Sequence, residues 1–261
     1  MFAREIKKGP SELDFQDFQE LLKQLNKKGI AARSQARLIS GIKSFYNYLL
    51  IEEIIEDNPS ELLTTPKLPS QLPDTLSVEE IDKTIRVIDL SKKDGYRTKR
   101  ILATTYRSGL RVSELINLNI ADVHFKEEFV KVKGKGDKER LVPMGLGTKK
   151  ILESYYNGVR IHIEPATGHH NYLFLNKHGK KLSRVMIFMI VKACVEKSGI
   201  RKNVSPHTFR HSFASHLVEG GADLRAVQEM LGHESITTTE IYTHLDESYL
   251  RNTLLDFHPR S

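Results

Sequence analysis

The chain has 261 residues, 39% of them hydrophobic and 28% charged, which is enough for one large domain or two ordinary ones and unlike the composition of a disordered protein. Its net charge of +7 arises entirely after residue 73, because residues 1–73 hold ten basic and ten acidic side chains and the rest hold thirty and twenty-three. Such a balance suits a polyanionic partner, although many basic proteins bind no nucleic acid.

Membrane insertion and secretion are not indicated. No window has the roughly 18 apolar residues of a membrane span, and the start MFAREIKKGPSELDF lacks the apolar core of a signal peptide. The single cysteine, Cys194, excludes an internal disulfide framework and should be buried, since it lies in the apolar run MIFMIVKACV. We therefore expect a cytoplasmic protein.

Apolar residues recur at helical spacing in two stretches near the start, 12–28 and 31–53, which predicts two helices. The second stretch carries Arg33, Arg37 and Lys43 before its first acidic residue. A helix with an exposed stripe of one sign can lie along a phosphate backbone, but an ordinary solvated face has the same pattern. These residues are therefore only candidate DNA contacts.

A proline-rich stretch separates this part from the rest. No helix interior can hold the four prolines between positions 57 and 77. They are Pro59, Pro66, Pro69 and Pro73. We interpret 67–74 as a semi-extended linker. The predicted organisation is a small helical domain at 1–66 and a larger domain at 75–261.

The larger domain should begin with helices. Ser77 and Glu80 have the spacing of a capping box, so a helix should start immediately after Ser77. Further helices are expected at 96–108 and 112–118, separated by a break at Gly109.

Arg111 follows that break at a helix start, where anions bind readily, and a guanidinium can bind two phosphate oxygens at once. Glu114, three residues on, is placed to orient it. An ordinary surface pair of arginine and glutamate would have the same spacing.

The spacing of the apolar residues then changes from that of a helix to the alternation of β-strands. The stretch FVKVKGKGDKERLVPM alternates on both sides of a glycine-rich turn, which predicts a β-hairpin with Lys135 in the turn. This is no nucleotide-binding loop, which needs GxxxxGK[ST] between a strand and a helix, but it could be an ordinary basic turn. The run YLFL at 172–175 predicts another short strand.

From 183 onward the chain is predicted to be helical almost to its end, and Ser205-Pro206 resembles an N-cap followed by a proline at the first helical position. His207 and Arg210 are three residues apart on one face of that helix, with His211 beside them. The two histidines alone could suggest zinc, but no HExxH glutamate and no cysteine set accompanies them.

The last block, LGHESITTTEIYTH, places Tyr242 nine residues after His233. A lone tyrosine here would normally be a half-buried helix residue. In this chain two arginines, a lysine and two histidines are available to bind a phosphodiester and reduce its charge, and a tyrosine near them can attack the phosphate.

These blocks together resemble the signature of the tyrosine recombinase (phage-integrase) family, most closely its Xer branch. The pattern is an arginine in GLRxSE, a lysine in a hairpin, HxxR, LGH and a tyrosine nine residues later, and all six positions are filled in order. The linker PKLPSQLPDTLS and the ending FHPR are similar as well. The implied fold is a two-domain DNA clamp, mostly helical, with a small antiparallel β-sheet.

The resemblance implies roles in strand cleavage. Tyr242 would attack the phosphate, form a 3′-phosphotyrosyl bond and release a 5′-hydroxyl. Lys135 would protonate the departing oxygen, and His207 would help to take the tyrosine proton. A free phenol has a pKa near 10, so only about one in a thousand is ionised at pH 7 and assistance is required.

The remaining site residues would bind the phosphate or support the site. The resemblance assigns the non-bridging oxygens to Arg111, Arg210 and His233. Glu114 would orient its arginine, and His211 would serve in packing or support. No metal ion, ATP or other cofactor is implied.

The implied function is site-specific recombination, with resolution of chromosome dimers as the Xer-type role. The family works as a tetramer on two DNA sites, and the last helix, here 247–257, would dock on a neighbouring subunit. A related recombinase and a DNA translocase are candidate partners. An integrase of a mobile element, a type IB topoisomerase and a non-catalytic DNA-binding protein remain open alternatives.

The chain departs from the pattern of the Xer-like proteins at its start. Xer-like proteins usually begin with a further helix before the one predicted at 12–28. We therefore expect the DNA clamp formed by the first domain to be incomplete, with the cleavage residues unaffected because all of them follow the linker.

Overall fold

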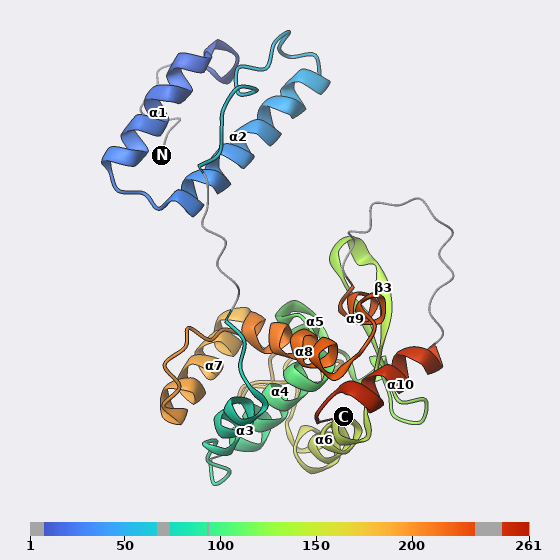
Figure 1. Ribbon diagram of the computed structural model, residues 1–261. Coiled ribbons are helices and arrows are strands. Elements are labelled where there is room, and N and C mark those ends of the chain that lie inside the picture. Colours follow the sequence, from blue (N-terminus) through green and yellow to red (C-terminus); the bar gives the residue numbers. More distant parts are fainter. Residues whose placement is uncertain (1–7, 67–73, 93, 233–246, 261) are drawn as a thin grey trace. The chain divides into compact units, whose positions relative to one another are not determined.

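The computed structural model describes residues 8–66, 74–92, 94–232 and 247–260. The chain forms two compact units, Met1–Leu72 and Pro73–Ser261. Both are mostly helical, and the described residues contain one small antiparallel sheet, in the second unit (Figure 1). This is the fold class that the sequence predicts. No helix in the described part of the chain is both long and apolar enough to cross a membrane.

The first unit is built on helices α1 (Phe15–Lys27) and α2 (Ala32–Ile51), which lie within the two stretches predicted to be helical. Asp14 caps α1 by accepting a hydrogen bond from the Asp17 backbone at 2.9 Å. The two helices pack through an edge-to-face contact between Phe18 and Tyr46, whose ring centroids are 5.3 Å apart. The buried core of the unit consists of Phe18, Leu21, Ile39, Tyr46, Leu49 and Leu63.

The second unit begins as its local sequence signals predict. Ser77 accepts a hydrogen bond from the Glu80 backbone, and the Glu80 carboxylate accepts one from the Ser77 backbone at 2.8 Å, which is a reciprocal capping box. The helices that the structure describes in this unit are α3 (Val78–Arg86), α4 (Gly95–Ser108), α5 (Val112–Asn117), α6 (Leu146–Gly158), α7 (Arg184–Ser198), α8 (Pro206–Gly220), α9 (Leu224–Leu231) and α10 (Glu247–Phe257). The short 3-10 helices among the described residues are η2 (Pro10–Glu12), η3 (Ile120–Asp122), η4 (Lys135–Asp137) and η5 (Arg160–His162).

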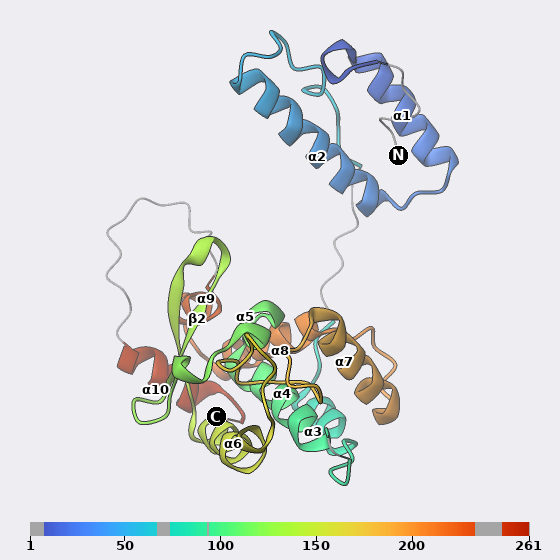
Figure 2. The same cartoon turned by 180° about the vertical axis from the view of Figure 1, so that it is seen from behind.

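The predicted hairpin is present as strands β2 (Phe129–Lys133) and β3 (Glu139–Pro143), joined through η4. A two-residue strand, β1 (Val123–His124), which the sequence did not predict, pairs with the other side of β2 and completes an antiparallel sheet of order β1-β2-β3. The register pairs Val130 with Val142 and Val132 with Arg140. Figures 1 and 2 both show the hairpin beside α9 and α10, which contact β3.

The predicted strand at 172–175 is wrong. Only isolated bridges occur there, from Asn119 to Tyr172 and from Leu175 to Lys181. The backbone carbonyls at the two ends of the run bind arginine side chains in place of a strand partner: Tyr172 accepts from Arg160 at 2.9 Å, and Leu175 accepts from Arg97 at 3.0 Å. Leu173, Phe174 and Leu175 are all buried, so this run fills the core and does not alternate as a strand would.

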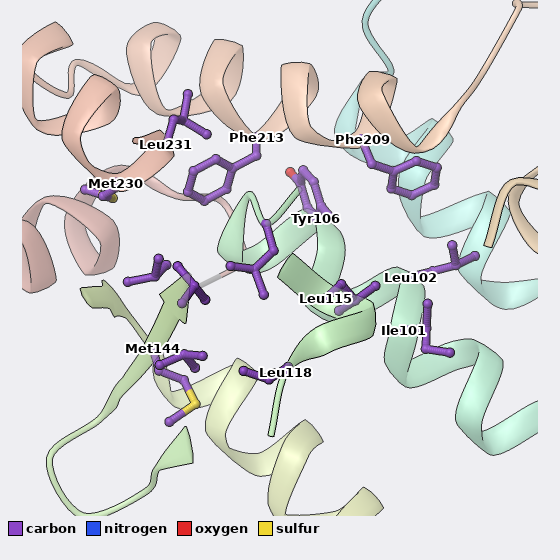
Figure 3. Close-up of a cluster of buried hydrophobic side chains, with 14 of the residues drawn as sticks. Ile101, Leu102, Tyr106, Leu115, Leu118, Met144, Phe209, Phe213, Met230 and Leu231 are labelled. Atoms are coloured by element: carbon purple, nitrogen blue, oxygen red, sulfur yellow. The ribbon is translucent and has the colours of Figure 1, made fainter. Parts of the chain in front are cut away.

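The core of the second unit lies around α4, as Figure 3 shows. Phe209 and Phe213 project from α8 toward this core, and Tyr106 of α4 lies beneath them. At the far end of the cluster, Met230 and Leu231 close the core from the end of α9. The packing therefore fixes α8 and the end of α9 against the helix that precedes the break at 109.

Helix α10 packs against its own unit, where it contacts α8, α9 and β3. Its apolar residues Leu250 and Leu254 belong to the core. In the single chain Leu250 and Leu254 are buried internally and Tyr249 is 44% exposed, so the expected docking of 247–257 on a neighbouring subunit stays a prediction. The segment after the helix is anchored as well, because Arg260 Nη2 binds Asp82 Oδ2 of α3 at 2.6 Å.

Candidate active site

Arg111 is presented by a tight break between two helices. Gly109 ends α4 with φ of 57°, and α5 begins immediately after Arg111. A Cβ atom at residue 109 would lie 2.5 Å from Cδ1 of Phe213, so the close approach of α8 as well as the left-handed backbone requires glycine there. The Arg111 side chain remains 34% exposed and is available to a ligand.

Glu114 is hydrogen-bonded to Arg111 in the structure. The carboxylate accepts hydrogen bonds from the Arg111 backbone N–H at 2.8 Å and from Arg111 Nη1 at 2.9 Å. Its side chain is only 1% exposed. Burial opposes ionisation, but hydrogen bonds from Arg140 and Arg111 outweigh it and hold the pKa of Glu114 below its ordinary value. The carboxylate is therefore the anionic centre of an arginine cluster.

Arg210 enters the same cluster from α8. Its Nη1 and Nη2 donate to the carbonyl oxygens of Gly109 and Leu231, both at 2.5 Å, and Nη1 lies 3.8 Å from Glu114 Oε2. Burial, followed by the nearby charge of Arg111, lowers the pKa of Arg210 to about 10, so the guanidinium stays protonated at neutral pH. The structure thus brings Arg111, Glu114 and Arg210 together from α5 and α8.

A third arginine, Arg140 of β3, completes the cluster and was not predicted from the sequence. Its Nη1 and Nη2 donate to the two oxygens of Glu114 at 2.7 and 2.9 Å. One signal could have revealed it. Arg140 lies two residues before the buried Val142 and opposite the buried Val132, so it is a charged residue on the core face of the hairpin.

The three guanidinium groups converge on the end of α9. The carbonyl oxygen of Met230 accepts from Arg140 Nε at 2.9 Å, that of Leu231 from Arg210, and that of Gly232 from Arg111 Nη2 at 2.7 Å. A helix C-terminus carries partial negative charge and unsatisfied carbonyls, so cations stabilise it. Three positive charges around one carboxylate leave a surplus of two, which suits a phosphate.

His207 and His211 of α8 have different surroundings from Arg210. His207 is exposed at the first turn of the helix, whereas Arg210, one turn on, is buried. His211 is also exposed and does not pack in the core, so of its two expected roles, packing or support of the site, support stays a prediction. Among the described residues, no group of three or more histidine, cysteine, aspartate or glutamate side chains could hold a metal ion.

The side chains of the other predicted cleavage residues fall outside what the structure describes. The backbone of Lys135 lies in η4 at the end of the hairpin, as predicted, but its side chain is not described. His233 and Tyr242 lie outside the described residues. The chain reaches His233 directly after Gly232, whose carbonyl Arg111 binds.

The candidate DNA-binding residues lie on α2 in the first unit. Arg33 and Arg37 are exposed, and Arg37 lines a shallow groove with apolar residues of the same helix, among them Leu38 and Phe45. Lys43 is held within the unit, since its Nζ donates to the carbonyl oxygen of Glu61 at 2.9 Å. Arg33 and Arg37 are therefore better placed than Lys43 to meet a ligand.

Comparison with known proteins agrees with the predicted resemblance. The sequence model of the family described as "Phage integrase family" matches residues 74–248 of this chain. Tyrosine recombinase XerD of Staphylococcus haemolyticus is 46% identical over 249 residues, which cover 95% of this chain and 84% of that protein. The crystal structure of XerA recombinase shares 34% identity with a TM-score of 0.57, covering 96% of this chain and 85% of that one. XerH site-specific recombinase bound to difH substrate shares 26% identity with a TM-score of 0.69, covering 96% and 73%.

Proposed function

The chain belongs to the phage integrase family and is a homologue of the tyrosine recombinase XerD, and from this premise we propose how its residues carry out site-specific DNA recombination. The observation that carries the proposal is the convergence of Arg111 and Arg210 on one buried carboxylate beside the end of α9. A surplus of fixed positive charge at this point favours the additional negative charge of a phosphate in the transition state.

In this proposal Arg111 and Arg210 bind the non-bridging oxygens of the scissile phosphate, with His233 donating a further hydrogen bond. Their orientation is supported by Glu114, which holds Arg111, and by the backbone carbonyls that hold both arginines. Donors that are already fixed cost little reorganisation when charge develops, which is why such a site accelerates phosphoryl transfer.

Tyr242 is the proposed nucleophile, and the product is a 3′-phosphotyrosyl bond with a free 5′-hydroxyl. His207 takes the tyrosine proton, and Lys135 donates a proton to the leaving oxygen. The exposed position of His207 on α8 leaves it accessible to a partner outside the described residues. The protein–DNA ester conserves the energy of the broken bond, so rejoining by the 5′-hydroxyl needs no ATP.

The DNA-binding organisation is likewise a proposal. The first unit contacts duplex DNA through the exposed Arg33 and Arg37 of α2, and together with the second unit it closes on the duplex as a clamp. Recombination proceeds in a tetramer on two sites, in the cytoplasm at the nucleoid, and serves to resolve chromosome dimers. Docking of 247–257 on a neighbour through Leu250 and Leu254 would require α10 to leave its own core, whereas Tyr249 is already exposed.

The test is covalent capture. Duplexes that the full chain selects from a random-sequence pool are nicked near the cleavage position, so that the released strand diffuses away and the adduct accumulates. Wild type should form a covalent protein–DNA adduct without added metal or ATP, and Tyr242→Phe should form none. Absence of an adduct with wild type, or an undiminished adduct with Tyr242→Phe, rejects the proposed chemistry. Relaxation of plasmids that lack the selected site would instead indicate a topoisomerase.

A further inference from the structure

We infer that Arg140 positions the hairpin that carries Lys135 for proton transfer, an inference that rests on the proposed function. Arg140 is the second residue of β3, and its side chain is only 13% exposed. It connects the hairpin to α5 on one side and to the end of α9 on the other. These two attachments carry the inference.

The first attachment is a fork-to-fork ion pair. Arg140 Nη1 and Nη2 meet Glu114 Oε1 and Oε2 at 2.7 and 2.9 Å, and the carboxylate is buried. A bidentate pair fixes the relative orientation of the two planar groups, which a single contact does not. Strand β3 therefore has a defined position relative to α5, the helix that starts after Arg111.

The second attachment is to the end of α9. Arg140 Nε donates to the carbonyl oxygen of Met230 at 2.9 Å. Gly232 approaches the same side chain so closely that a Cβ atom there would lie 3.0 Å from Arg140 Cδ and 3.1 Å from Cζ and Nε. The guanidinium is thus enclosed between the carboxylate and the helix end.

The pairing of β2 with β3 fixes where the tip of the hairpin lies relative to Arg140. Arg140 faces Val132 across the ladder, and the next pair toward the tip is Lys133 with Glu139. The Gly134 backbone N–H then donates to the carbonyl of Lys138 at 2.7 Å and closes the loop that contains Lys135. Only a few ladder positions separate the anchored residue from the lysine, so a shift of β3 would displace the loop.

The remaining members of the cluster would tolerate the loss of Arg140. Glu114 would keep its bonds from the Arg111 backbone at 2.8 Å and side chain at 2.9 Å, with Arg210 Nη1 at 3.8 Å. The hairpin, in contrast, would lose the side chain that ties it to both neighbouring elements. We therefore expect the loss to affect the proton that Lys135 delivers more than the charge at the phosphate.

Two nicked duplexes test this, identical except that sulfur replaces the 5′-bridging oxygen of the scissile phosphate in one. A thiolate leaves without a proton, since thiols have a pKa of about 8.5. In the full chain, Arg140→Met should cleave the oxygen substrate about 10²-fold more slowly than wild type, as expected for impaired general acid catalysis. It should cleave the sulfur substrate at close to the wild-type rate. Lys135→Ala should behave alike, and the double variant should be no slower than Lys135→Ala.

Arg160→Met is the matched control. Arg160 is also a buried arginine that binds backbone carbonyls, those of Tyr172 at 2.9 Å and His170 at 2.7 Å, and its loss should not depend on the leaving atom. If Arg140→Met does not fold, Arg140→Lys, which loses the fork but keeps the charge, should show the same selectivity for sulfur.

Equal slowing on both substrates, or normal cleavage of the oxygen substrate, would overturn the inference about Arg140. Failure of wild type to form any adduct would instead overturn the proposed function, so the two failures are distinguishable.

Discussion

Arg111 Nη2 donates a hydrogen bond to the carbonyl oxygen of Gly232 at 2.7 Å, which ties the start of α5 to the residue immediately after α9. Gly232 has φ of 64° and ends the helix in the left-handed conformation. The next residue is His233. Arg111 therefore has a structural task besides its proposed contact with phosphate: it fixes the point from which the chain continues to His233 and Tyr242.

The first prediction concerns Arg210. Arg210→Ala removes a positive charge and the bonds to the carbonyls of Gly109 and Leu231, so adduct formation should slow by about 10²–10³-fold, the usual cost of one preorganised donor. Arg210→Lys keeps the charge but cannot donate in two directions from a planar group, and it should recover only part of the rate.

The rate of covalent adduct formation measures both variants. The control is Arg201→Ala, which removes an exposed arginine shortly before α8 and should leave cleavage unchanged. Wild-type cleavage by Arg210→Ala would contradict the assignment of this residue to the phosphate.

The second prediction concerns Glu114. Glu114→Gln leaves three buried or half-buried guanidinium groups without their anion, and removal of one partner from a buried ion pair typically costs about 3–5 kcal/mol of the free energy of unfolding. Urea unfolding of the full chain measures the loss. Glu139→Gln, which removes an exposed ion pair with Lys131 and Lys133 on the same hairpin, should leave the unfolding curve in place. Equal stability of the two variants would show that the cluster does not need its carboxylate.

The third prediction compares two glycines with similar backbones. Gly109 and Gly199 have φ of 57° and 69°. At Gly199 nothing lies within 4 Å of an added Cβ, so Gly199→Ala should cost only the conformational penalty of about 1–2 kcal/mol. At Gly109 the added atom would meet the buried ring of Phe213 at 2.5 Å, so Gly109→Ala should lose about 1–3 kcal/mol more by overpacking.

The ring of Phe213, which the added methyl group would displace, belongs to the helix that carries Arg210. Gly109→Ala should therefore also slow adduct formation, while Gly199→Ala should not. Thermal or urea unfolding and the adduct assay together separate the two costs. Equal destabilisation by both substitutions would show that the contact with Phe213 relaxes freely.

Local signals predicted the elements that depend on local chemistry. The reciprocal bonds of Ser77 and Glu80 start α3, and the alternating pattern around the glycine-rich turn is a hairpin. Helix α6, by contrast, was not predicted. The run at 172–175 was predicted wrongly because its backbone carbonyls bind Arg97 and Arg160, and no local pattern shows such contacts.

In the candidate site, too, only the contacts between residues close in the sequence could be predicted. Arg111 and Glu114 are three residues apart, so their pairing could be expected from spacing. Arg140 was missed because its partners, Glu114 and Met230, lie 26 and 90 residues away along the chain. His211 has the expected position on α8, but its exposure depends on which face of the helix the core covers.

The fourth prediction concerns the buried His258, which follows α10. Its ring lies between Tyr106 and Phe213, with centroids 4.9 and 5.2 Å away, and burial, with the nearby charge of Arg107, lowers the pKa of His258 to about 3. The unfolded chain takes up a proton at this residue as the pH falls through about 6.5, whereas the folded chain does not until about 3. The neutral ring therefore stabilises the fold fully above pH 6.5, and this contribution is lost progressively as the pH falls toward 3.

His258→Leu removes the titrating group, so the difference in free energy of unfolding between wild type and variant should be constant above pH 7 and should shrink or reverse between pH 6.5 and 4. Urea unfolding across this range measures it, and His211→Leu, which replaces an exposed histidine, is the matched control. The Arg260 backbone N–H donates to His258 Nδ1 at 3.1 Å and the Arg260 side chain binds Asp82, so protonation of His258 would also disturb the anchoring of the segment after α10. An unchanged pH dependence in His258→Leu would show that the ring is not held neutral in the folded chain.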